Sequence, residues 1–187
     1  MKPFPLLLHA NYFEQGQSLD RACRLARELE VDGIEFRQHR GGFPGSNSDE
    51  SPGSDLEYLD EVCRALDRSP QKWVSFGAPG VNLMSSDDDL RARELEKALI
   101  YYRRAAERLP IKVINAFAGI LANPDKTVSP LEYHRHGSAI ATPVHWRQAV
   151  DGYRQLGALA EELEFRFAFE THAVYLHDTI VSSMTLV

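Results

Sequence analysis

The chain has 187 residues, of which 43% are apolar and 26% are charged, and this is the composition of a globular protein with one sizeable core. Its formal net charge of −6 argues against nucleic acid as a partner, because a nucleic-acid-binding protein normally carries a basic face. No stretch approaches the roughly 20 apolar residues that span a bilayer, and Pro3 and Pro5 interrupt the apolar start too early for a signal peptide. We therefore expect a cytoplasmic protein without a nucleic-acid or membrane partner.

Short apolar segments alternate with amphipathic ones, and this alternation predicts parallel β/α units. In chain order the predicted elements are a strand at 5–10, a helix capped by Ser18, a strand at 33–37, a helix opened by Ser54 and Glu57, a strand at 73–76, a helix from Asp88 or Asp89 to Leu109, a strand at 111–117, a helix opened by Thr142 and Pro143, a strand at 165–170, and a helix capped by Asp178 or Thr179. Residues 41–54 are rich in Gly, Ser, Pro and Asp and are predicted to form a loop.

The two cysteines are too few for a disulfide framework. Cys23 and Cys63 each fall on the apolar stripe of a predicted helix. We therefore expect both to be inert, buried thiols.

The number of units distinguishes two α/β folds. A (β/α)₈ barrel typically needs ~250 residues, and this chain supplies five predicted strands. No Gly-x-Gly-x-x-Gly turn follows the first predicted strand, which weakens an open, dinucleotide-binding sheet. We therefore favour an incomplete (β/α)₈ TIM barrel, with about five of its eight strands, over a doubly wound open sheet. Residues 1–187 are expected to form a single domain.

In a barrel the active site lies at the carboxyl ends of the strands. The polar residues predicted at those ends are His9 and Asn11 on the first strand, Glu35 and Arg37 on the second, Asn115 on the fourth, and Glu170 and His172 on the fifth. These side chains could bind a substrate, and for Glu35 and Arg37 an ion pair at the rim is an equally good interpretation.

Glu170 is the sharpest candidate, because it follows an almost wholly apolar strand. A carboxylate there is expected to be partly desolvated, so it must be paired, protonated or bound to a metal. Alternation along a strand would turn Glu170 and His172 to the same side. The plainer alternatives are an ion pair of Glu170 with Arg166 or Arg37, and a hydrogen-bonded histidine at the strand end.

Another pair of imidazoles, His134 and His136, lies in the long loop after the fourth predicted strand. The pair could hold a metal, but no carboxylate neighbours it, so solvated loop histidines are the favoured interpretation. Asp178 is likewise expected to be a helix cap rather than a metal ligand.

The run from Glu170 to Thr179, Glu-Thr-His-Ala-Val-Tyr-Leu-His-Asp-Thr, resembles the Glu-Thr-His-x-x-x-Leu-x-Asp-Thr signature of the xylose isomerase-like barrel family. Residues 30–37 resemble that family's second strand, usually Gly-x-Asp-Gly-Ile-Glu-x-Arg. The resemblance covers nearly the whole chain in strand order. It implies a barrel enzyme of carbohydrate metabolism, because the family includes sugar phosphate isomerases and epimerases.

The resemblance also implies a divalent metal, Mn²⁺, Mg²⁺, Co²⁺ or Zn²⁺. Members of the family hold it with a Glu on strand five, an Asp on strand six, a His on strand seven and a Glu on strand eight, and only the first of these maps here, to Glu170. Glu170 would then be metal ligand and general base, removing a proton next to the carbonyl of a sugar or other polyhydroxy-carbonyl substrate. His172 would hold a substrate oxygen or orient the site.

Three alternatives stay open at this point. The first is a lyase on the same scaffold, a 3-dehydroshikimate dehydratase, which shares the Glu-Thr-His run. The second is a DNA-repair endonuclease with three zinc ions, against which the net charge of −6 speaks. The third is a non-catalytic fragment or binding module. A homo-oligomer is also possible, because an incomplete barrel exposes strand edges that a second chain could cover.

Overall fold

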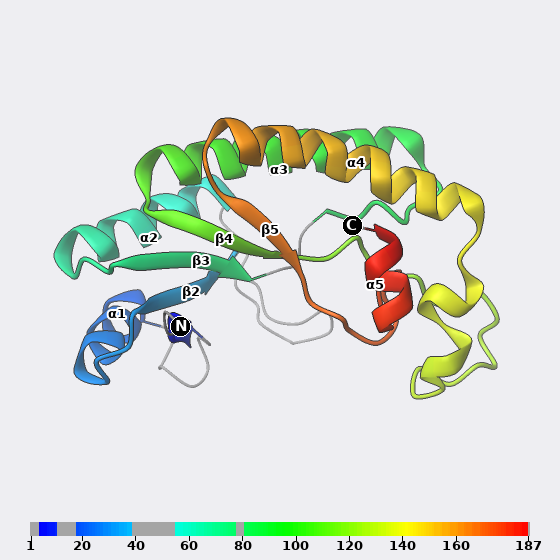
Figure 1. Ribbon diagram of the computed structural model, residues 1–187, viewed down its shortest axis with the longest axis horizontal. Coiled ribbons are helices and arrows are strands. Elements are labelled where there is room, and N and C mark those ends of the chain that lie inside the picture. The colour runs from blue at the N-terminus through cyan, green and yellow to red at the C-terminus, as the bar shows by residue number, and fades with distance from the viewer. Residues whose placement is uncertain (1–3, 11–17, 39–54, 78–80, 187) are drawn as a thin grey trace. The chain divides into compact units, whose positions relative to one another are not determined.

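The computed structural model describes residues 4–10, 18–38, 55–77 and 81–186. The predicted site residue Asn11, the predicted cap Ser54 and the predicted loop 41–54 lie outside these residues. The described elements follow the predicted chain order, as Figure 1 shows. Most of the predicted strand limits lie within one or two residues of those in the structure.

The strands are β1 (Leu7–His9), β2 (Gly33–Arg37), β3 (Trp73–Gly77), β4 (Ile111–Ala116) and β5 (Arg166–Phe169). The α-helices are α1 (Leu19–Glu28), α2 (Asp55–Arg68), α3 (Asp88–Arg108), α4 (Pro143–Glu162) and α5 (Ile180–Leu186). Two short 3₁₀ helices, η1 (Tyr133–Arg135) and η2 (Gly137–Ile140), lie between β4 and α4. None of the described helices combines the length and the apolar character needed to cross a membrane.

The five strands form one sheet in the order β1-β2-β3-β4-β5. The pairs β1–β2, β2–β3 and β3–β4 are parallel. The strand order follows the chain order and has no switch point, which confirms the barrel-type arrangement over the doubly wound sheet. By residue contacts the chain separates into two compact units, Met1–Gly77 with Tyr101–Ile114, and Ala78–Ile100 with Asn115–Val187.

The first unit is built around β2 and β3, whose backbones approach closely. A Cβ on Gly33 would lie 2.1 Å from the carbonyl oxygen of Trp73, so a residue without a side chain is required there. Phe36 and Phe76 are buried with ring centroids 6.1 Å apart, and the ring of Tyr101 meets Phe76 edge-on at 5.6 Å. Burying each such side chain contributes roughly 1.5–3 kcal/mol, so this cluster stabilises the unit.

Helices α1 and α2 contact each other in the first unit. Ser18 caps α1 as predicted, its Oγ accepting a hydrogen bond from the backbone N–H of Arg21 at 3.3 Å. Cys23 and Cys63 are free and buried, which confirms their predicted place in the core. Burial raises the pKa of the Cys23 thiol to about 11, so this thiol is not reactive at neutral pH.

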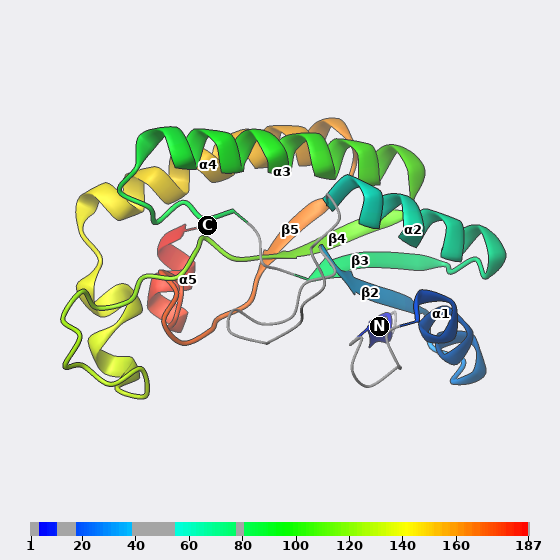
Figure 2. The ribbon, with the colours of Figure 1, turned by 180° about the vertical axis from the view of Figure 1, so that it is seen from behind.

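In the second unit, α4 packs on β5 and α5 packs on α4 (Figure 2). Helix α4 begins with Thr142 as its cap and Pro143 in its first turn, as predicted. His145 completes the cap, because its Nδ1 accepts a hydrogen bond from the N–H of Thr142 at 3.1 Å. At the start of α5 the cap is Thr179 rather than Asp178, and its Oγ1 accepts a hydrogen bond from the N–H of Ser182 at 3.0 Å.

The long loop between β4 and α4 is held by the imidazole of His136. Its Nδ1 accepts a hydrogen bond from the N–H of Asn123 at 2.9 Å, and its Nε2 donates to the carbonyl oxygen of Ser129 at 3.0 Å. His136 is only 4% exposed, whereas His134 is exposed. The expectation of a solvated pair therefore holds for His134 and is wrong for His136. Both ring nitrogens of His136 bind backbone, so His134 and His136 do not form a metal pair.

Candidate functional site

In the first unit, three polar side chains form a row across neighbouring strands. His9 of β1 lies opposite Glu35 of β2, and Glu35 lies opposite Ser75 of β3. The Glu35 carboxylate accepts a hydrogen bond from His9 Nδ1 at 2.8 Å and another from Ser75 Oγ at 3.2 Å. The row therefore fixes the Glu35 side chain with two donors and orients the imidazole of His9.

Gly77, the last residue of β3, leaves room for this pair. A Cβ there would lie 3.0 Å from Glu35 Oε1 and 3.6 Å from the His9 ring. Arg37, half-buried, lies opposite Gly77 in the sheet, so it is close to the row in register. The structure does not show the predicted ion pair between Glu35 and Arg37. The Glu35 carboxylate instead accepts hydrogen bonds from His9 and Ser75, which lie on the neighbouring strands.

In the second unit, the carboxyl ends of β4 and β5 bring Asn115 and Glu170 together. Asn115 Nδ2 donates a hydrogen bond to Glu170 Oε2 at 2.7 Å, a short distance that is typical of a bond to a charged acceptor. The other amide atom, Asn115 Oδ1, is buried and has no hydrogen-bond partner among the described residues. A buried acceptor without a donor is energetically costly, and this oxygen is closed to solvent.

Aromatic rings surround the segment that follows Glu170. The ring of His172 meets Phe117 edge-on at 5.9 Å and Tyr175 edge-on at 5.4 Å, and Tyr175 stacks on Phe117 at 4.6 Å. Nδ1 of His172 donates to the carbonyl oxygen of Ala173 at 3.0 Å, which leaves Nε2 as the acceptor nitrogen. Burial and the nearby charge of Glu170 raise the pKa of Tyr175, so its hydroxyl keeps its proton and remains a donor.

His177, a few residues further along the chain, is completely buried between aromatic rings, with 0% of its surface exposed. Its ring lies 5.2 Å from that of Phe169 and 5.9 Å from that of Phe117. Neither ring nitrogen has a hydrogen-bond partner among the described residues. Burial lowers the pKa of His177, with the charge of Asp178 acting in the opposite direction, so the imidazole is neutral at physiological pH.

Two expectations about Glu170 and His172 need correction. Glu170 is exposed and not partly desolvated. β5 ends at Phe169, so the alternation that would turn Glu170 and His172 to one side does not extend to them. The Glu170 carboxylate accepts a hydrogen bond from Asn115, and among the described residues of the second unit it forms no ion pair with Arg166.

A divalent ion would find few ligands here. Among the described residues, no group of three or more His, Cys, Asp and Glu side chains is placed to hold a metal. Glu170 offers one unengaged carboxylate oxygen, whereas the Oδ1 of Asn115 is closed to solvent. Hard divalent ions take six or more oxygen ligands or a closed set of nitrogen and oxygen ligands, so these two residues do not complete a site.

Sequence reasoning missed the residues that support the candidates. Ser75 interrupts the apolar strand β3 at the register position of Glu35, and this polar residue in a buried strand was the available signal. Tyr175 lies within the Glu-Thr-His run itself, but nothing in its spacing indicates that it would approach Glu170. Phe117 follows β4 and is recognisable as part of the aromatic cluster only once the chain is folded.

Comparisons with known proteins agree with this fold. A family model described as xylose isomerase-like TIM barrel matches residues 23–186. No match was found among curated proteins.

Several solved structures resemble the chain. They include 3-keto-D-glucoside 4-epimerase from E. coli, with 14% identity, a TM-score of 0.63 and coverage of 98% of this chain and 63% of that one. D-psicose 3-epimerase from Clostridium cellulolyticum H10 has 16% identity, a TM-score of 0.64 and coverage of 98% and 60%. An AP endonuclease of family 2 from Brucella melitensis has 14% identity, a TM-score of 0.57 and coverage of 98% and 65%. The chain thus spans about three fifths of the length of these structures, and identities this low establish the fold alone.

Proposed function

Because the chain belongs to the xylose isomerase-like TIM barrel family, we propose that it acts on a sugar or sugar phosphate as an isomerase or epimerase. Sugar epimerases among the similar structures support the substrate class, a small polyhydroxy-carbonyl compound. The observation that carries the proposal is the pairing of Glu170 with Asn115. In this pair the carboxylate that we propose as the base is held by an amide N–H at the carboxyl ends of two adjacent strands.

The reaction begins with removal of a carbon-bound proton next to the substrate carbonyl. The C–H bond breaks, the proton passes to the Glu170 carboxylate, and the electron pair moves into the carbonyl to give an enediolate. Protonation of the same carbon from its opposite face, by water or a second acid, gives an epimer. Return of the proton from Glu170 to the neighbouring carbon, with transfer of the hydroxyl proton to the former carbonyl oxygen, gives an isomer. Asn115 holds the Glu170 carboxylate by its amide N–H.

His172 is proposed to accept a hydrogen bond from a substrate hydroxyl through Nε2, because its Nδ1 is engaged with Ala173. In the first unit, His9, Glu35 and Arg37 are proposed to bind substrate oxygens, and Glu35 would act chiefly by holding the His9 ring. Asn11 keeps its proposed place in the substrate site on the strength of the sequence alone.

Metal dependence is part of the proposal through the family resemblance, with Glu170 as one ligand of Mn²⁺, Mg²⁺, Co²⁺ or Zn²⁺. A divalent ion bound there would polarise the substrate carbonyl and stabilise the enediolate. Glu170 and Asn115 do not complete a metal site, so we expect calorimetry to show only weak binding of Mn²⁺ by the 187-residue chain. Tight binding that survives Glu170→Gln would show that the metal ligand has been placed wrongly.

We also propose that the protein acts in the cytoplasm. Its two cysteines are both free and buried, and free thiols are characteristic of proteins from reducing compartments.

Deuterium exchange tests the proposed chemistry directly. The chain is incubated in D₂O with Mn²⁺ and a panel of ketoses, aldoses and their phosphates, and loss of the C–H signal next to the carbonyl is followed by proton NMR. We expect exchange with at least one sugar, and we expect Glu170→Gln to slow it by ~10²–10⁴-fold, because the amide keeps the shape and loses the basicity. Glu96→Gln, the same change at an exposed position on α3, is the control.

Two results would contradict the proposal. One is a wild-type chain that exchanges no sugar in the panel. The other is exchange that persists in Glu170→Gln at the rate of Glu96→Gln. A dehydratase shares the proton-removal step and then expels a hydroxyl group as water, so release of an unsaturated product would identify the lyase in place of the isomerase.

A further inference from the structure

The side chain of Tyr175 ends in a hydroxyl group that hydrogen-bonds to none of the described residues. The residue is half-buried, and its hydroxyl is not among the buried polar atoms that lack a partner, so a ligand can reach it. Burial and the negative charge of Glu170 raise the pKa of this hydroxyl, and the charge acts on it because the carboxylate lies nearby. An uncommitted donor therefore lies beside the carboxylate that we propose as the base.

The ring of Tyr175 is fixed from two sides. It stacks on Phe117 with 4.6 Å between the ring centroids and 29° between the ring planes, and it meets the ring of His172 edge-on at 5.4 Å. Phe117 follows Asn115 by two residues, and His172 follows Glu170 by two. The segments that carry the hydrogen-bonded pair of Asn115 and Glu170 thus also hold the ring of Tyr175.

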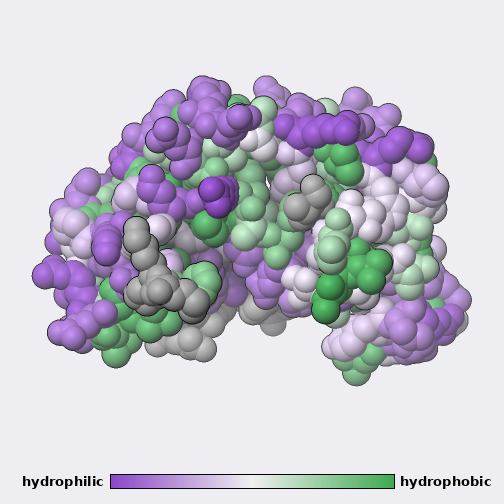
Figure 3. All heavy atoms as spheres, in the orientation of Figure 1, coloured by the Kyte–Doolittle hydropathy of each residue, from purple (hydrophilic) through white to green (hydrophobic). Residues whose placement is uncertain are grey.

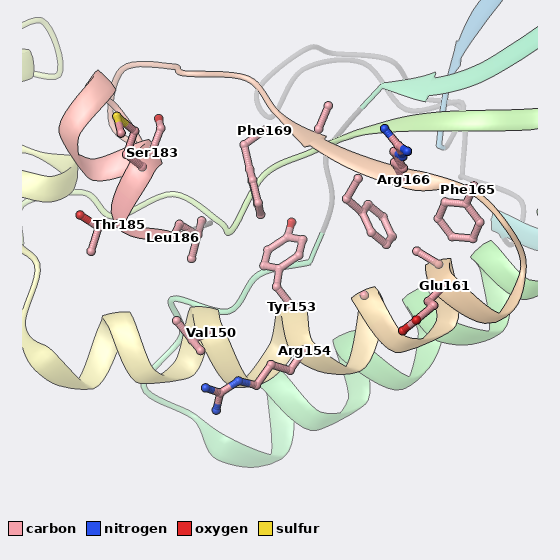
Figure 4. Close-up of a pocket in the computed structure, with 15 residues that line it drawn as sticks. Val150, Tyr153, Arg154, Glu161, Phe165, Arg166, Phe169, Ser183, Thr185 and Leu186 are labelled. Carbon is pink, nitrogen blue, oxygen red and sulfur yellow. The ribbon is translucent and has the colours of Figure 1, made fainter.

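Phe117 is itself anchored from α4. The outer surface of α4 is mainly hydrophilic, as Figure 3 shows, and Figure 4 shows the Tyr153 side chain reaching from α4 toward Phe169. The Tyr153 hydroxyl donates a hydrogen bond to the backbone carbonyl oxygen of Phe117 at 2.8 Å. The ring of Tyr175 therefore packs against a part of the chain that is itself held in place.

The backbone before Tyr175 is strained. Val174 has a φ of +66°, in the left-handed region, which is rare for a β-branched residue. Neighbouring contacts hold it there, because its carbonyl oxygen accepts a hydrogen bond from the N–H of Leu121 at 2.8 Å, and Ile120 and Tyr175 form an antiparallel bridge. Such conformations persist only where the surrounding structure enforces them, and they cluster at active sites. The strain therefore favours a functional role for the residue that it positions.

The long β4–α4 loop completes this support. Gly137, with a φ of +57°, donates a hydrogen bond through its N–H to the carbonyl oxygen of Leu121 at 2.8 Å. It passes so close to the segment after β5 that a Cβ on it would lie 2.6 Å from the carbonyl oxygen of Tyr175. The backbone of Tyr175 is thus held by residues that are distant in the sequence, which gives its hydroxyl a defined place beside Glu170.

We propose that the Tyr175 hydroxyl donates a hydrogen bond to the carbonyl oxygen of the substrate while Glu170 removes the neighbouring carbon-bound proton. Negative charge develops on that oxygen as the enediolate forms, and a donor that is already in place stabilises it without reorganisation. The hydroxyl keeps its own proton, so Tyr175 assists the reaction as a hydrogen-bond donor and is not the acid that protonates carbon. This role rests on the proposed function, and it makes Tyr175 a further catalytic residue of the same site.

Steady-state deuterium exchange, with the sugar that the wild-type chain exchanges fastest, tests this role. Tyr175→Phe removes the hydroxyl and keeps the ring that stacks on Phe117. We expect kcat for exchange to fall by ~10–10²-fold and KM to change by less than about twofold, since the lost hydrogen bond strengthens only as charge develops. Tyr133→Phe, the same change at a 53% exposed position of the same unit, is the matched control and should leave both constants unchanged.

Glu170→Gln is measured alongside, to separate the role of Tyr175 from the proposed function, and circular dichroism checks that each variant keeps the fold. Three outcomes would overturn the role of Tyr175. The first is exchange by Tyr175→Phe at the rate of Tyr133→Phe while Glu170→Gln loses exchange, which would leave the proposed function standing. The second is a raised KM with an unchanged kcat, which would mean that the hydroxyl binds substrate and transition state equally. The third is a wild-type chain that exchanges no sugar, which would remove the proposed function as well.

Discussion

The hydrogen bond between Asn115 and Glu170 can be tested without a substrate, by replacing Asn115 with Asp. The substitution keeps the size and shape of the side chain but turns the donor Nδ2 into a carboxylate oxygen. Two carboxylates would then face each other across the 2.7 Å that now separates donor and acceptor. The bond would be lost and a repulsion would replace it.

Both effects can be estimated. A hydrogen bond to a charged group is worth about 1.5 kcal/mol or more when it is sheltered, and the exposure of Glu170 reduces this to about 1 kcal/mol. Two carboxylate charges that have moved apart to about 4 Å repel by about 1 kcal/mol at the dielectric constant of water. The expected loss of unfolding free energy at neutral pH is therefore about 2 kcal/mol, which corresponds to a fall in Tm of about 4–8 °C for a chain of this size.

The loss of unfolding free energy should depend on pH. Proton linkage gives the direction of this dependence. The repulsion raises the pKa of the carboxylate pair in the folded Asn115→Asp variant above its value in the unfolded chain. The folded variant therefore holds a proton that the unfolded chain has released, and its stability falls as the pH rises through this interval. Relative to wild type, the variant should be least stable at neutral pH and should recover toward pH 4, where the pair takes up a proton.

Thermal unfolding followed by circular dichroism from pH 4 to 8 measures this difference. Asn82→Asp serves as the control, because Asn82 is exposed in the same unit and uses its Oδ1 as an acceptor, a role that a carboxylate can keep. We expect a small, pH-independent change for the control. If the Tm difference between Asn115→Asp and wild type does not vary with pH, or matches that of Asn82→Asp, the two side chains are not bonded in solution.

Gly33→Ala should lower the free energy of unfolding in urea by about 1–3 kcal/mol. The new Cβ would lie 2.1 Å from the carbonyl oxygen of Trp73, so β2 would have to move. An unchanged midpoint of urea unfolding would contradict this packing. His177→Leu should make stability less dependent on pH. The depressed pKa of His177 means that its contribution is complete above about pH 6.5 and is lost as the pH falls. The slope at pH 5–6 should decrease in His177→Leu and not in the exposed control His134→Leu.

The sequence predicted the elements well because their signals are local. Ser18 and Thr142 open helices where predicted, since a cap depends on a few residues of neighbouring chain. The parallel order of the strands also followed from the alternation of strands and helices. The sequence left two candidate caps for α5, Asp178 and Thr179. The Asp178 carboxylate instead accepts a hydrogen bond from the N–H of Ser138 in the β4–α4 loop, and Thr179 is the cap.

The candidate site was only partly predictable, because its contacts join residues that are distant in the sequence. Glu170 and Asn115 were both identified as strand-end residues, but their hydrogen bond depends on how β4 and β5 align. The same holds for the row from His9 to Ser75, which the register of three strands determines. His136 shows the opposite error, since a loop histidine with no local partner was expected to be solvated and proved to organise the loop.

The low sequence identity to the similar structures limits how far their functions can be transferred to this chain. A TM-score of 0.63 at 14% identity is possible because a barrel core requires apolar side chains of suitable volume, and many sequences provide them. The fold therefore persists while the polar residues at the strand ends change, and those residues decide the reaction. In this chain they include the carboxylate of Glu170, which accepts a hydrogen bond from the Asn115 amide. The Asn115–Glu170 pair, rather than the fold, is therefore the feature whose substitution tests the proposed reaction.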